Sequence, residues 1–316
     1  MQAPRIKRPL NGVLMLDKAL GASSNAALQQ AKRLYQAAKA GHAGTLDPLA
    51  TGLLPVLFGE ATKFSSDLLD ADKSYLAQIK LGVSTATADA EGEVLATRAV
   101  KVTAEQLVAA LNAFRGEIQQ TPPLYSALKH AGKPLYAYAR AGIDIARAPR
   151  RVTIHALVLQ WFEGDRLALS ITCSKGTYIR SIAHDLGELL GCGAHLAALR
   201  RSAAGRFGLD SAHTLQDLEA MSEAERDRCL LPADTLLQEL PEVCLEPAQQ
   251  ARFLQGQVVP WAGPPQPRVR VYGSDGTLLG VGELGIDGAI SPKRVIAAAQ
   301  QCALGADAIQ KIAENP

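Results

Sequence analysis

Apolar and polar residues alternate along several short stretches of the chain, and this period of two predicts β-strands. Residues 75–81 carry an apolar side chain at every second position. Residues 151–162 and 166–173 also alternate, and the Glu163-Gly164-Asp165 segment between them has the composition of a hairpin turn. Residues 12–16 form a short, continuous apolar run, which predicts a buried strand.

Other stretches carry apolar residues at helical spacing. Ser23 or Ser24 is a suitable N-cap for a helix whose apolar stripe continues to Ala38, and Gly41 stands where a glycine that follows a helix end is expected. Thr103 has the capping-box spacing to Gln106, which predicts a helix through residue 114. Further helices are predicted in three places: 53–69, 180–190, and 214–240 with a break at Pro232.

The order of these elements predicts an α+β fold. Helices alternate with strands that form hairpins as often as crossovers, so we expect a mixed, mainly antiparallel sheet. The character of the chain changes after Cys244, where prolines accumulate and the strand-like stretches 268–272 and 278–284 follow. We therefore predict a catalytic-type domain over 1–247 and a small, β-rich domain over 248–316.

The bulk properties are those of an ordinary globular protein. The chain has 316 residues, of which 47% are hydrophobic and 20% charged. Its apolar runs are too short to cross a bilayer, and no apolar stretch follows the basic N-terminus as in a secretion signal, so a cytoplasmic protein is expected. The five cysteines are scattered and odd in number, which predicts neither a disulfide framework nor a zinc site.

One segment of the chain is strongly basic although the net charge is only +2. Residues 129–151 hold six Lys or Arg and one acid, a local charge of +5, which leaves −3 for the rest of the chain. Tyr136 and Tyr138 lie among these cations, a mixture that suits a surface for RNA phosphates and bases. Charge alone is equally consistent with a solvated loop and helix.

Residues 41–55 bend tightly around a single carboxylate, that of Asp47. Glycine permits positive φ and close backbone approach, while Pro48 fixes its own φ and keeps Asp47 out of the helical region. The segment is therefore predicted to be a preformed loop. An Asp-Pro pair alone is also a common turn, in which the carboxylate caps its own backbone.

The unbroken pattern from Gly44 to Leu54 resembles the catalytic loop of the TruB family, the bacterial tRNA pseudouridine-55 synthases. The likeness covers roughly residues 10–210, because further family-like motifs follow in the family's order. Ala19 and Ala43 are small departures that replace no reacting group. After residue 250 the chain resembles the RNA-binding PUA domain only loosely. The other motifs are at 16–24, 73–75, 122–129, 176–180 and 199–201.

The resemblance implies an isomerase that converts uridine to pseudouridine in the T-loop (position 55, TΨC arm) of tRNA after flipping the base. Asp47 would be the catalytic nucleophile, although the sequence does not distinguish attack on the base from attack on the sugar. The reaction has no net redox change and transfers no external group, so no cofactor is expected. Four further substrate contacts are carried over: Arg180 as counter-charge to Asp47, Tyr75 as stacking ring, Tyr178 as positioning or proton-transfer group, and Leu199 as apolar wall.

Three more positions are predicted around this pocket. The family match places His42 where it would enter the space left by the flipped base, although a loop histidine bonded to backbone is the simpler interpretation. Lys18 and Lys129 are candidate phosphate contacts or structural residues. We expect an insertion at about 124–151 to bind the phosphates of tRNA, with no membrane association, no obligate protein partner and a monomeric state.

Two other functions remain open at this point. A non-catalytic RNA-binding or RNA-folding protein could use the same surface, but it would not need a desolvated carboxylate facing RNA. An unrelated hydrolase using Asp47 is a third hypothesis, and the sequence offers it no partner Ser, His or second carboxylate at a suitable spacing.

Overall fold

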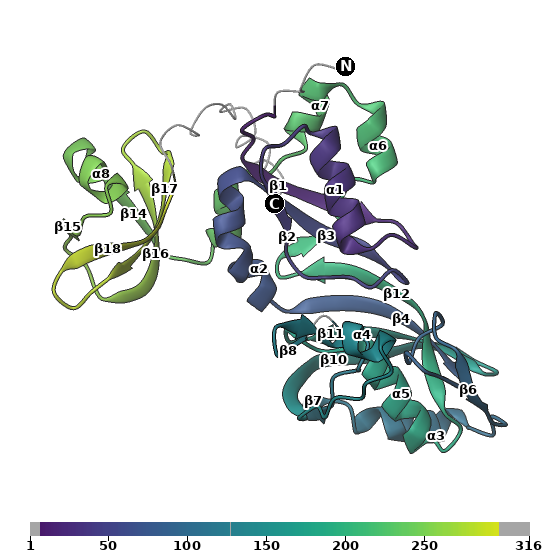
Figure 1. Ribbon diagram of the computed structural model, residues 1–316. Helices are drawn as coiled ribbons and strands as arrows, with labels where there is room; N and C mark the ends of the chain where they lie inside the picture. Colours follow the sequence, from purple (N-terminus) through teal and green to yellow (C-terminus); the bar gives the residue numbers. More distant parts are fainter. Residues whose placement is uncertain (1–6, 127, 297–316) are drawn as a thin grey trace.

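A curved nine-stranded sheet forms the centre of the larger domain in the computed structural model, which describes residues 7–126 and 128–296 (Figure 1). Strand β12 pairs with β3 in parallel, and the other pairs of this sheet are antiparallel. The predicted α+β fold with a mixed, mainly antiparallel sheet is thus confirmed. In spatial order the strands are β1 (Gly12–Lys18), β3 (Ala50–Phe58), β12 (Ala194–Ala204), β4 (Lys73–Leu81), β11 (Arg166–Cys173), β10 (Arg150–Glu163) and β7 (Gly116–Gln120), with β2 (Ala40–His42) on β3 and β13 (Phe207–Gly208) on β12.

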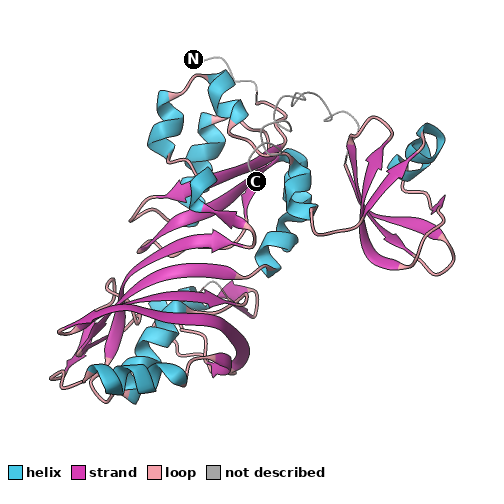
Figure 2. Ribbon diagram, turned by 180° about the vertical axis from the view of Figure 1, so that it is seen from behind, coloured by secondary structure: helices cyan, strands magenta, loops and turns pink. Residues whose placement is uncertain are grey.

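Helices pack on the two halves of this sheet. Helix α1 (Ser24–Leu34) buries its apolar stripe against the strands of the N-terminal half, and its N-cap is Ser23 as predicted. Helices α3 (Ala104–Asn112) and α5 (Ile179–Leu189) share a second core with β4, β10 and β11. Figure 2 shows α1 at one end of the sheet and the pair α3 and α5 at the other. The capping box at the start of α3 and the β10–β11 hairpin are confirmed.

Two predicted helix boundaries are wrong. Helix α1 ends at Leu34, several residues before the end that Gly41 predicts. The residue with a left-handed conformation after the helix is Gln36, with φ of 51°. Gly41 instead lies in β2 and pairs with Leu57. The chain leaves the helix early because residues 40–42 gain sheet hydrogen bonds to β3, a partner that local sequence does not reveal.

The predicted helix over 53–69 is also wrong in its first half. Residues 53–58 belong to β3, where their side chains are buried on both faces of the sheet. A continuous apolar run fits a doubly covered strand as well as a helix, and the pairing with β1 decides between them. Helical structure begins only with η1 (Gly59–Phe64) and α2 (Ser65–Asp70).

The stretch 214–240 is helical in three short pieces rather than in two pieces separated at Pro232. Ser222 forms a capping box with Glu225, so a new helix starts well before Pro232. The pieces are α6 (Leu215–Ala220), α7 (Glu223–Arg228) and η3 (Ala233–Leu237), and η2 (Leu209–Ser211) precedes them.

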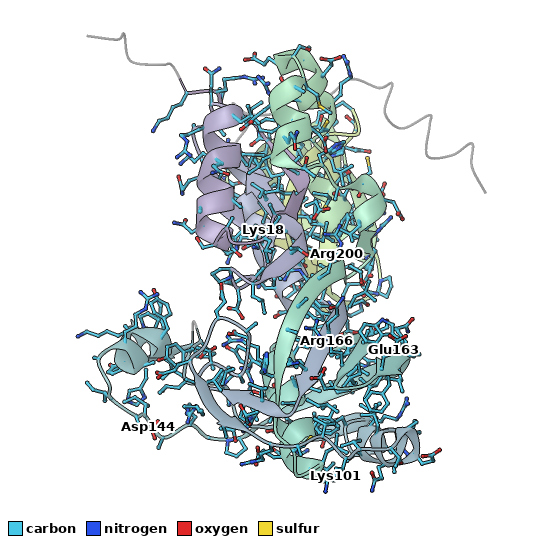
Figure 3. All side chains as sticks on the ribbon, turned by 90° about the vertical axis from the view of Figure 1, so that its right-hand side faces the viewer. Lys18, Lys101, Asp144, Glu163, Arg166 and Arg200 are labelled. Atoms are coloured by element: carbon cyan, nitrogen blue, oxygen red, sulfur yellow. The ribbon has the colours of Figure 1, made fainter. Side chains whose placement is uncertain are left out.

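The basic segment forms a small hairpin and a helix beside the main sheet. Strands β8 (Lys129–His130) and β9 (Lys133–Pro134) pair, and α4 (Leu135–Arg140) follows them. Leu135 anchors α4 by its burial, whereas the neighbouring cations are exposed. In Figure 3 the loop after α4 places Asp144 at the outer edge of the molecule. A second small hairpin consists of β5 (Val83–Thr85) and β6 (Val94–Thr97).

A separate five-stranded sheet forms the C-terminal domain, so the predicted β-rich unit is present. Its first strand starts at Glu242, ahead of the boundary predicted at 247. Part of the predicted domain, 297–316, lies outside the described residues. In spatial order the strands are β14 (Glu242–Leu245), β16 (Gln266–Gly273), β17 (Leu278–Leu284), β18 (Ala289–Val295) and β15 (Val259–Pro260), and α8 (Pro247–Leu254) packs on them.

The two domains are joined through α2 and η3. Arg268 of β16 lies 2.6 Å from the Asp67 carboxylate of α2, and the Tyr272 hydroxyl donates to Asp234 at 2.9 Å. A small apolar cluster that includes Phe64 and Val281 also packs between the two domains. None of the helices in the described part of the chain has the length and apolar character that crossing a bilayer requires.

Candidate active site

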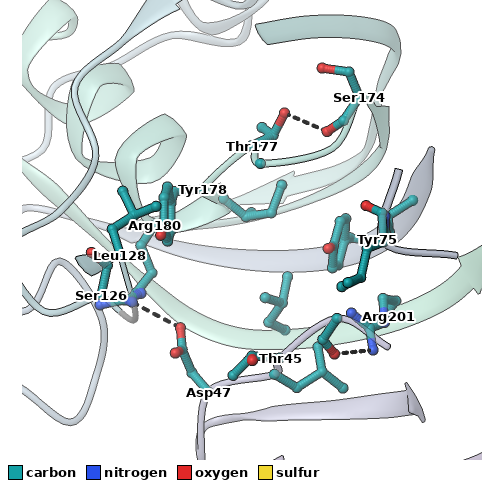
Figure 4. Close-up of a pocket in the computed structure, with 17 residues that line it drawn as sticks. Thr45, Asp47, Tyr75, Ser126, Leu128, Ser174, Thr177, Tyr178, Arg180 and Arg201 are labelled. Atoms are coloured by element: carbon teal, nitrogen blue, oxygen red, sulfur yellow. Dashed lines mark hydrogen bonds and ion pairs between the residues drawn. The ribbon is translucent and has the colours of Figure 1, made fainter. Parts of the chain in front are cut away.

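A pocket of about 320 Å³ opens between the two halves of the main sheet (Figure 4). Its floor is the loop at 44–47, one wall is the start of α5 with the segment near Ser126, and the opposite wall is formed by β4 and β12. Of the sequence-predicted residues, the lining includes Asp47, Tyr75, Tyr178, Arg180 and Leu199.

The loop that carries Asp47 is held on both sides. The Ser24 hydroxyl accepts from the Leu46 amide at 2.7 Å and donates to the Leu46 carbonyl at 2.9 Å, which ties the loop to the first residue of α1. Farther along, the Pro48 carbonyl accepts from the Gly21 amide at 2.9 Å. Gly44 has φ of +84°, a conformation that glycine adopts without strain. Asp47 is therefore presented by a rigid loop, as predicted from its sequence.

Arg180 faces Asp47 across the pocket floor, with 2.9 Å between its Nη2 and the Asp47 Oδ2 (Figure 4). The Arg180 side chain is only 5% exposed. Its guanidinium also donates to the carbonyls of Thr87 at 3.1 Å and Tyr125 at 2.8 Å. These contacts fix the guanidinium and leave Asp47 with a positioned counter-charge.

The Asp47 carboxylate is nevertheless open to the pocket, because 41% of its side chain is exposed. Burial on its protein side raises the pKa of Asp47, the Arg180 charge opposes that rise, and the carboxylate of Asp89 adds to it. An exposed carboxylate with a fixed cation behind it can attack an electrophilic carbon or stabilise a cationic intermediate.

Asp89 is a member of the site that the sequence did not single out. It lies behind Arg180, 3.5 Å from the guanidinium, with its side chain 4% exposed. The Thr87 hydroxyl and the Glu91 amide both donate to its Oδ1. Its stretch, 85–100, contains several acids of similar appearance, so nothing local marked this one as buried.

The opposite wall combines Tyr75, Leu199 and Arg201 on adjacent strands. Tyr75 lies directly across from Arg201 in the β4–β12 register, and Leu199 lies across from Ala77. Burial raises the pKa of the Tyr75 hydroxyl, while the neighbouring Arg201 charge lowers it. An apolar side chain and an aromatic ring on one wall suit a flat, unsaturated ring.

Tyr178 is held at the start of α5 by a buried amide side chain. The Gln120 Oε1 accepts from the Tyr178 amide at 2.7 Å, and its Nε2 donates to the Tyr178 carbonyl at 2.9 Å. The Arg150 guanidinium covers the Tyr178 ring at 4.9 Å. Gln120 is the last residue of β7, 58 positions away in sequence, and nothing distinguished it locally from the neighbouring Gln119.

Three predicted substrate residues do not line the pocket. Lys18 is 1% exposed, and its ammonium donates to the carbonyls of Ala19 at 3.0 Å and Ala22 at 2.6 Å. His42 is half-buried in β2, and its Nδ1 has no hydrogen-bond partner among the described residues. Lys129 is exposed on β8. The structure thus gives Lys18 a backbone-holding position, and the substrate contacts of all three remain predictions.

Lys73 belongs to the family motif at 73–75, but the sequence did not single it out as a site residue. It is 7% exposed, lines the pocket, and donates to the carbonyls of Leu68 and Leu69 at the end of α2. Burial, with the Arg201 charge, lowers its pKa to about 8. Over 7–126 and 128–296, no group of three or more His, Cys, Asp or Glu is arranged to hold a metal ion.

Three family models match the chain in succession. Residues 32–179 match "TruB family pseudouridylate synthase (N terminal domain)". Residues 180–238 match "tRNA pseudouridylate synthase B C-terminal domain", and 241–296 match "Pseudouridine synthase II TruB, C-terminal". The break between the last two models coincides with the start of the C-terminal sheet.

Curated relatives match nearly the whole chain. A protein of Nitrosospira multiformis named tRNA pseudouridine synthase B is 52% identical over 93% of this chain and 98% of its own. The protein of that name from Ralstonia nicotianae is 56% identical over 93% and 97%. Among solved structures, a chain of the "Cbf5-Nop10-Gar1 Complex" superposes with a TM-score of 0.69 at 26% identity, covering 93% of this chain and 87% of that chain.

Proposed function

The chain belongs to the TruB family of pseudouridylate synthases, and from that premise we propose that it converts uridine to pseudouridine at position 55 in the T-loop of tRNA. The resemblance inferred from the sequence motifs is confirmed, and pseudouridine synthases are isomerases. The choice of tRNA is supported by relatives named tRNA pseudouridine synthase B that match over 93% of the chain.

The observation that carries the mechanism is the Asp47–Arg180 pair between two tyrosine-bearing walls. In the reaction the N1–C1′ bond breaks, the uracil turns, and a C5–C1′ bond forms while the C5 proton is lost and N1 gains one. Asp47 is the nucleophile that holds the intermediate covalently, and Arg180 stabilises its charge before and after attack. Whether the bond forms to the sugar or to the base is left open by this geometry.

The walls supply what a flipped uridine needs. Extruding a base from a folded arm costs a few kcal/mol, and stacking on an aromatic ring returns about 1–3 kcal/mol. Tyr75 is the stacking ring, Leu199 closes the apolar wall, and Tyr178 positions the base from the other side. The pocket is large enough for one nucleoside but not for a stacked duplex.

Residues outside the pocket bind the rest of the arm. His42 occupies the space that the base vacates. Its Nδ1 is buried without a hydrogen-bond partner among the described residues, so the rest of the ring makes the contact with RNA. Lys129 and the other exposed cations of 129–151 contact phosphates. RNA affinity should therefore fall with salt, with a slope of about −0.7 to −0.9 per phosphate contacted. Binding that is independent of salt contradicts this assignment.

The second candidate is a non-catalytic RNA-binding or RNA-folding protein. It would bind RNA with the same surface, but it would not require the Asp47 carboxylate. A single experiment separates the two. The protein and its Asp47→Asn variant are incubated with an unmodified tRNA transcript, pseudouridine is mapped by position, and RNA binding is measured in parallel. A transcript with cytidine at position 55 is the matched substrate control.

Product at uridine 55 with wild type, none with Asp47→Asn, and similar binding by both establish the isomerase and the role of Asp47. Product at another position overturns the T-loop assignment while retaining the activity. Binding without product by wild type, on a transcript shown to be folded, supports the non-catalytic protein instead.

A further inference from the structure

Arg201 is an unusual residue for the middle of a β-sheet. It is 1% exposed and is the largest of the fully buried side chains. The salt bridges found among the described residues do not include it, so no carboxylate balances its charge. Burial lowers the pKa of this guanidinium. A buried cation with only neutral partners is costly to a fold, which calls for a specific reason for its position.

Its partners lie before and after Asp47 along the chain, at Gly44 in the catalytic loop and at Leu53 in β3. The Arg201 Nε donates to the Leu53 carbonyl at 2.7 Å, and Nη2 donates to the Gly44 carbonyl at 3.0 Å. These residues flank Asp47, one on each side. A guanidinium can hold both carbonyls at once because its donors lie in one rigid plane.

The glycines of the loop are shaped to this arginine. A Cβ added to Gly44 would lie 3.1 Å from the Arg201 Nη1, and one added to Gly52 would lie 2.3 Å from the Arg201 carbonyl oxygen. Both glycines also have positive φ. Gly44 therefore packs against the Arg201 guanidinium, and Gly52 packs against the Arg201 backbone.

The third neighbour is Tyr75, which lies directly across from Arg201 in the β4–β12 register, and whose hydroxyl and the Arg201 charge shift each other's pKa. Figure 4 shows the two side chains together on the wall opposite Tyr178 and Arg180. Arg201 thus contacts the loop that presents Asp47 and the ring that faces it across the pocket.

We propose that Arg201 is a positioning residue for the reaction: it sets the distance and angle between the Asp47 loop and the Tyr75 ring. The inference rests on the proposed function of those two residues. A flipped uridine stacked on Tyr75 is then presented to Asp47 in the attacking geometry without any contact between Arg201 and the reacting atoms. A misplacement of about 1 Å in such an arrangement costs about 100-fold in rate.

The test uses Arg201→Gln and Arg201→Lys in the full chain, with Arg200→Gln as the matched control. Arg200 is the adjacent arginine of β12, but it binds the Asp17 carboxylate at 2.6 Å and does not line the pocket; Figure 3 shows it near Lys18. Single-turnover formation of pseudouridine, RNA binding and thermal melting are measured for each variant.

We expect Arg201→Gln to slow the single-turnover rate about 100-fold and Arg201→Lys about tenfold, because a lysine keeps the charge but lacks the planar fork that holds both carbonyls. RNA affinity should change less than about threefold, since the phosphate contacts lie elsewhere. Arg200→Gln should stay within about threefold of wild type in rate. Should the Gln variant fail to fold, the Lys variant carries the test.

A cycle with Tyr75→Phe separates positioning from general stability. Tyr75→Phe keeps the ring but removes the hydroxyl of the residue that lies across from Arg201. Because neighbouring residues that act together are not additive, the double variant with Arg201→Lys should be clearly less impaired than the product of the two single effects. Effects that multiply, rates that fall only in step with RNA affinity, or Arg201 variants as fast as wild type overturn the proposal. A wild type that forms no pseudouridine refutes the proposed function instead.

Discussion

The two buried arginines of the pocket form an instructive contrast. Arg180 stands between two carboxylates, Asp47 at 2.9 Å and Asp89 at 3.5 Å, whereas the Arg201 guanidinium donates to two backbone carbonyls. Both side chains are almost wholly buried. One wall is therefore an ion cluster, whose function should depend mainly on charge. The other is a hydrogen-bonded frame, whose function should depend mainly on the shape of the side chain.

The supporting structure of the two walls differs as well. Arg180 lies in the first turn of α5 and is contacted by loop carbonyls near residues 87 and 125. Arg201 lies in β12, between β3 and β4, where sheet pairing fixes its backbone on both sides. We expect the first wall to adjust to the substrate and the second to serve as its fixed reference.

The largest effect should follow from removing the charge of the ion cluster. Arg180→Met keeps much of the length but leaves Asp47 and Asp89 without their cation, so we expect a loss of about 1000-fold in the single-turnover rate. Arg180→Lys should recover part of it, because the charge matters most on this wall. Rapid-quench assays on a tRNA transcript provide the measurement. A lysine variant as slow as the methionine variant argues that shape, and not charge, governs this wall.

A smaller loss is expected when the frame of the other wall is deformed. Gly44→Ala forces a Cβ toward Arg201 at a φ of +84°. The left-handed conformation costs a non-glycine residue about 1–2 kcal/mol, and the loop should shift enough to slow the reaction about tenfold to a hundredfold. Denaturant unfolding and rate assays measure the two effects. Gly276→Ala in the C-terminal domain is a control, because Gly276 also has positive φ but its Cβ would meet open space.

A milder perturbation of the ion cluster is Asp89→Asn, which keeps the shape but removes one of the two negative charges. Because the Asp89 carboxylate helps to raise the pKa of Asp47, the variant should lower that pKa. The acidic limb of the pH–rate profile should move to lower pH, with a loss of about tenfold at its plateau as Arg180 is less firmly held. An acidic limb that stays in place contradicts the assignment of that limb to Asp47.

The smallest effect concerns stability. The folded-state pKa of Asp47 lies above its ordinary value, so ionisation of this carboxylate opposes folding. As the pH rises from the ordinary aspartate pKa through the raised one, wild type should lose stability relative to Asp47→Asn, and the gap should then stay constant. Thermal melts of both proteins across that pH window test this. A variant that is less stable at neutral pH shows that the ion pair with Arg180 outweighs the burial.

Local sequence was sufficient for the elements whose signals are local. The loop around Asp47, the N-cap at Ser23, the capping box at Thr103 and the β10–β11 hairpin all depend on residues a few positions apart. The family motifs added the pocket set, and the structure brings Asp47, Tyr75, Tyr178, Arg180 and Leu199 together. Their catalytic and binding roles stay predictions until the variants are measured.

Tertiary structure decided the features that depend on strand pairing and on burial by distant parts of the chain. The run at 53–58 became a strand because β1 pairs with all of it and β2 with its end, and Gly41 lies in β2 through the same pairing. Asp89, Gln120 and Arg201 gained their positions from contacts with residues 58 to 157 positions away along the chain. The sequence determines the charge and size of each side chain. Its contacts with distant residues depend on how the strands and helices pack in the folded protein.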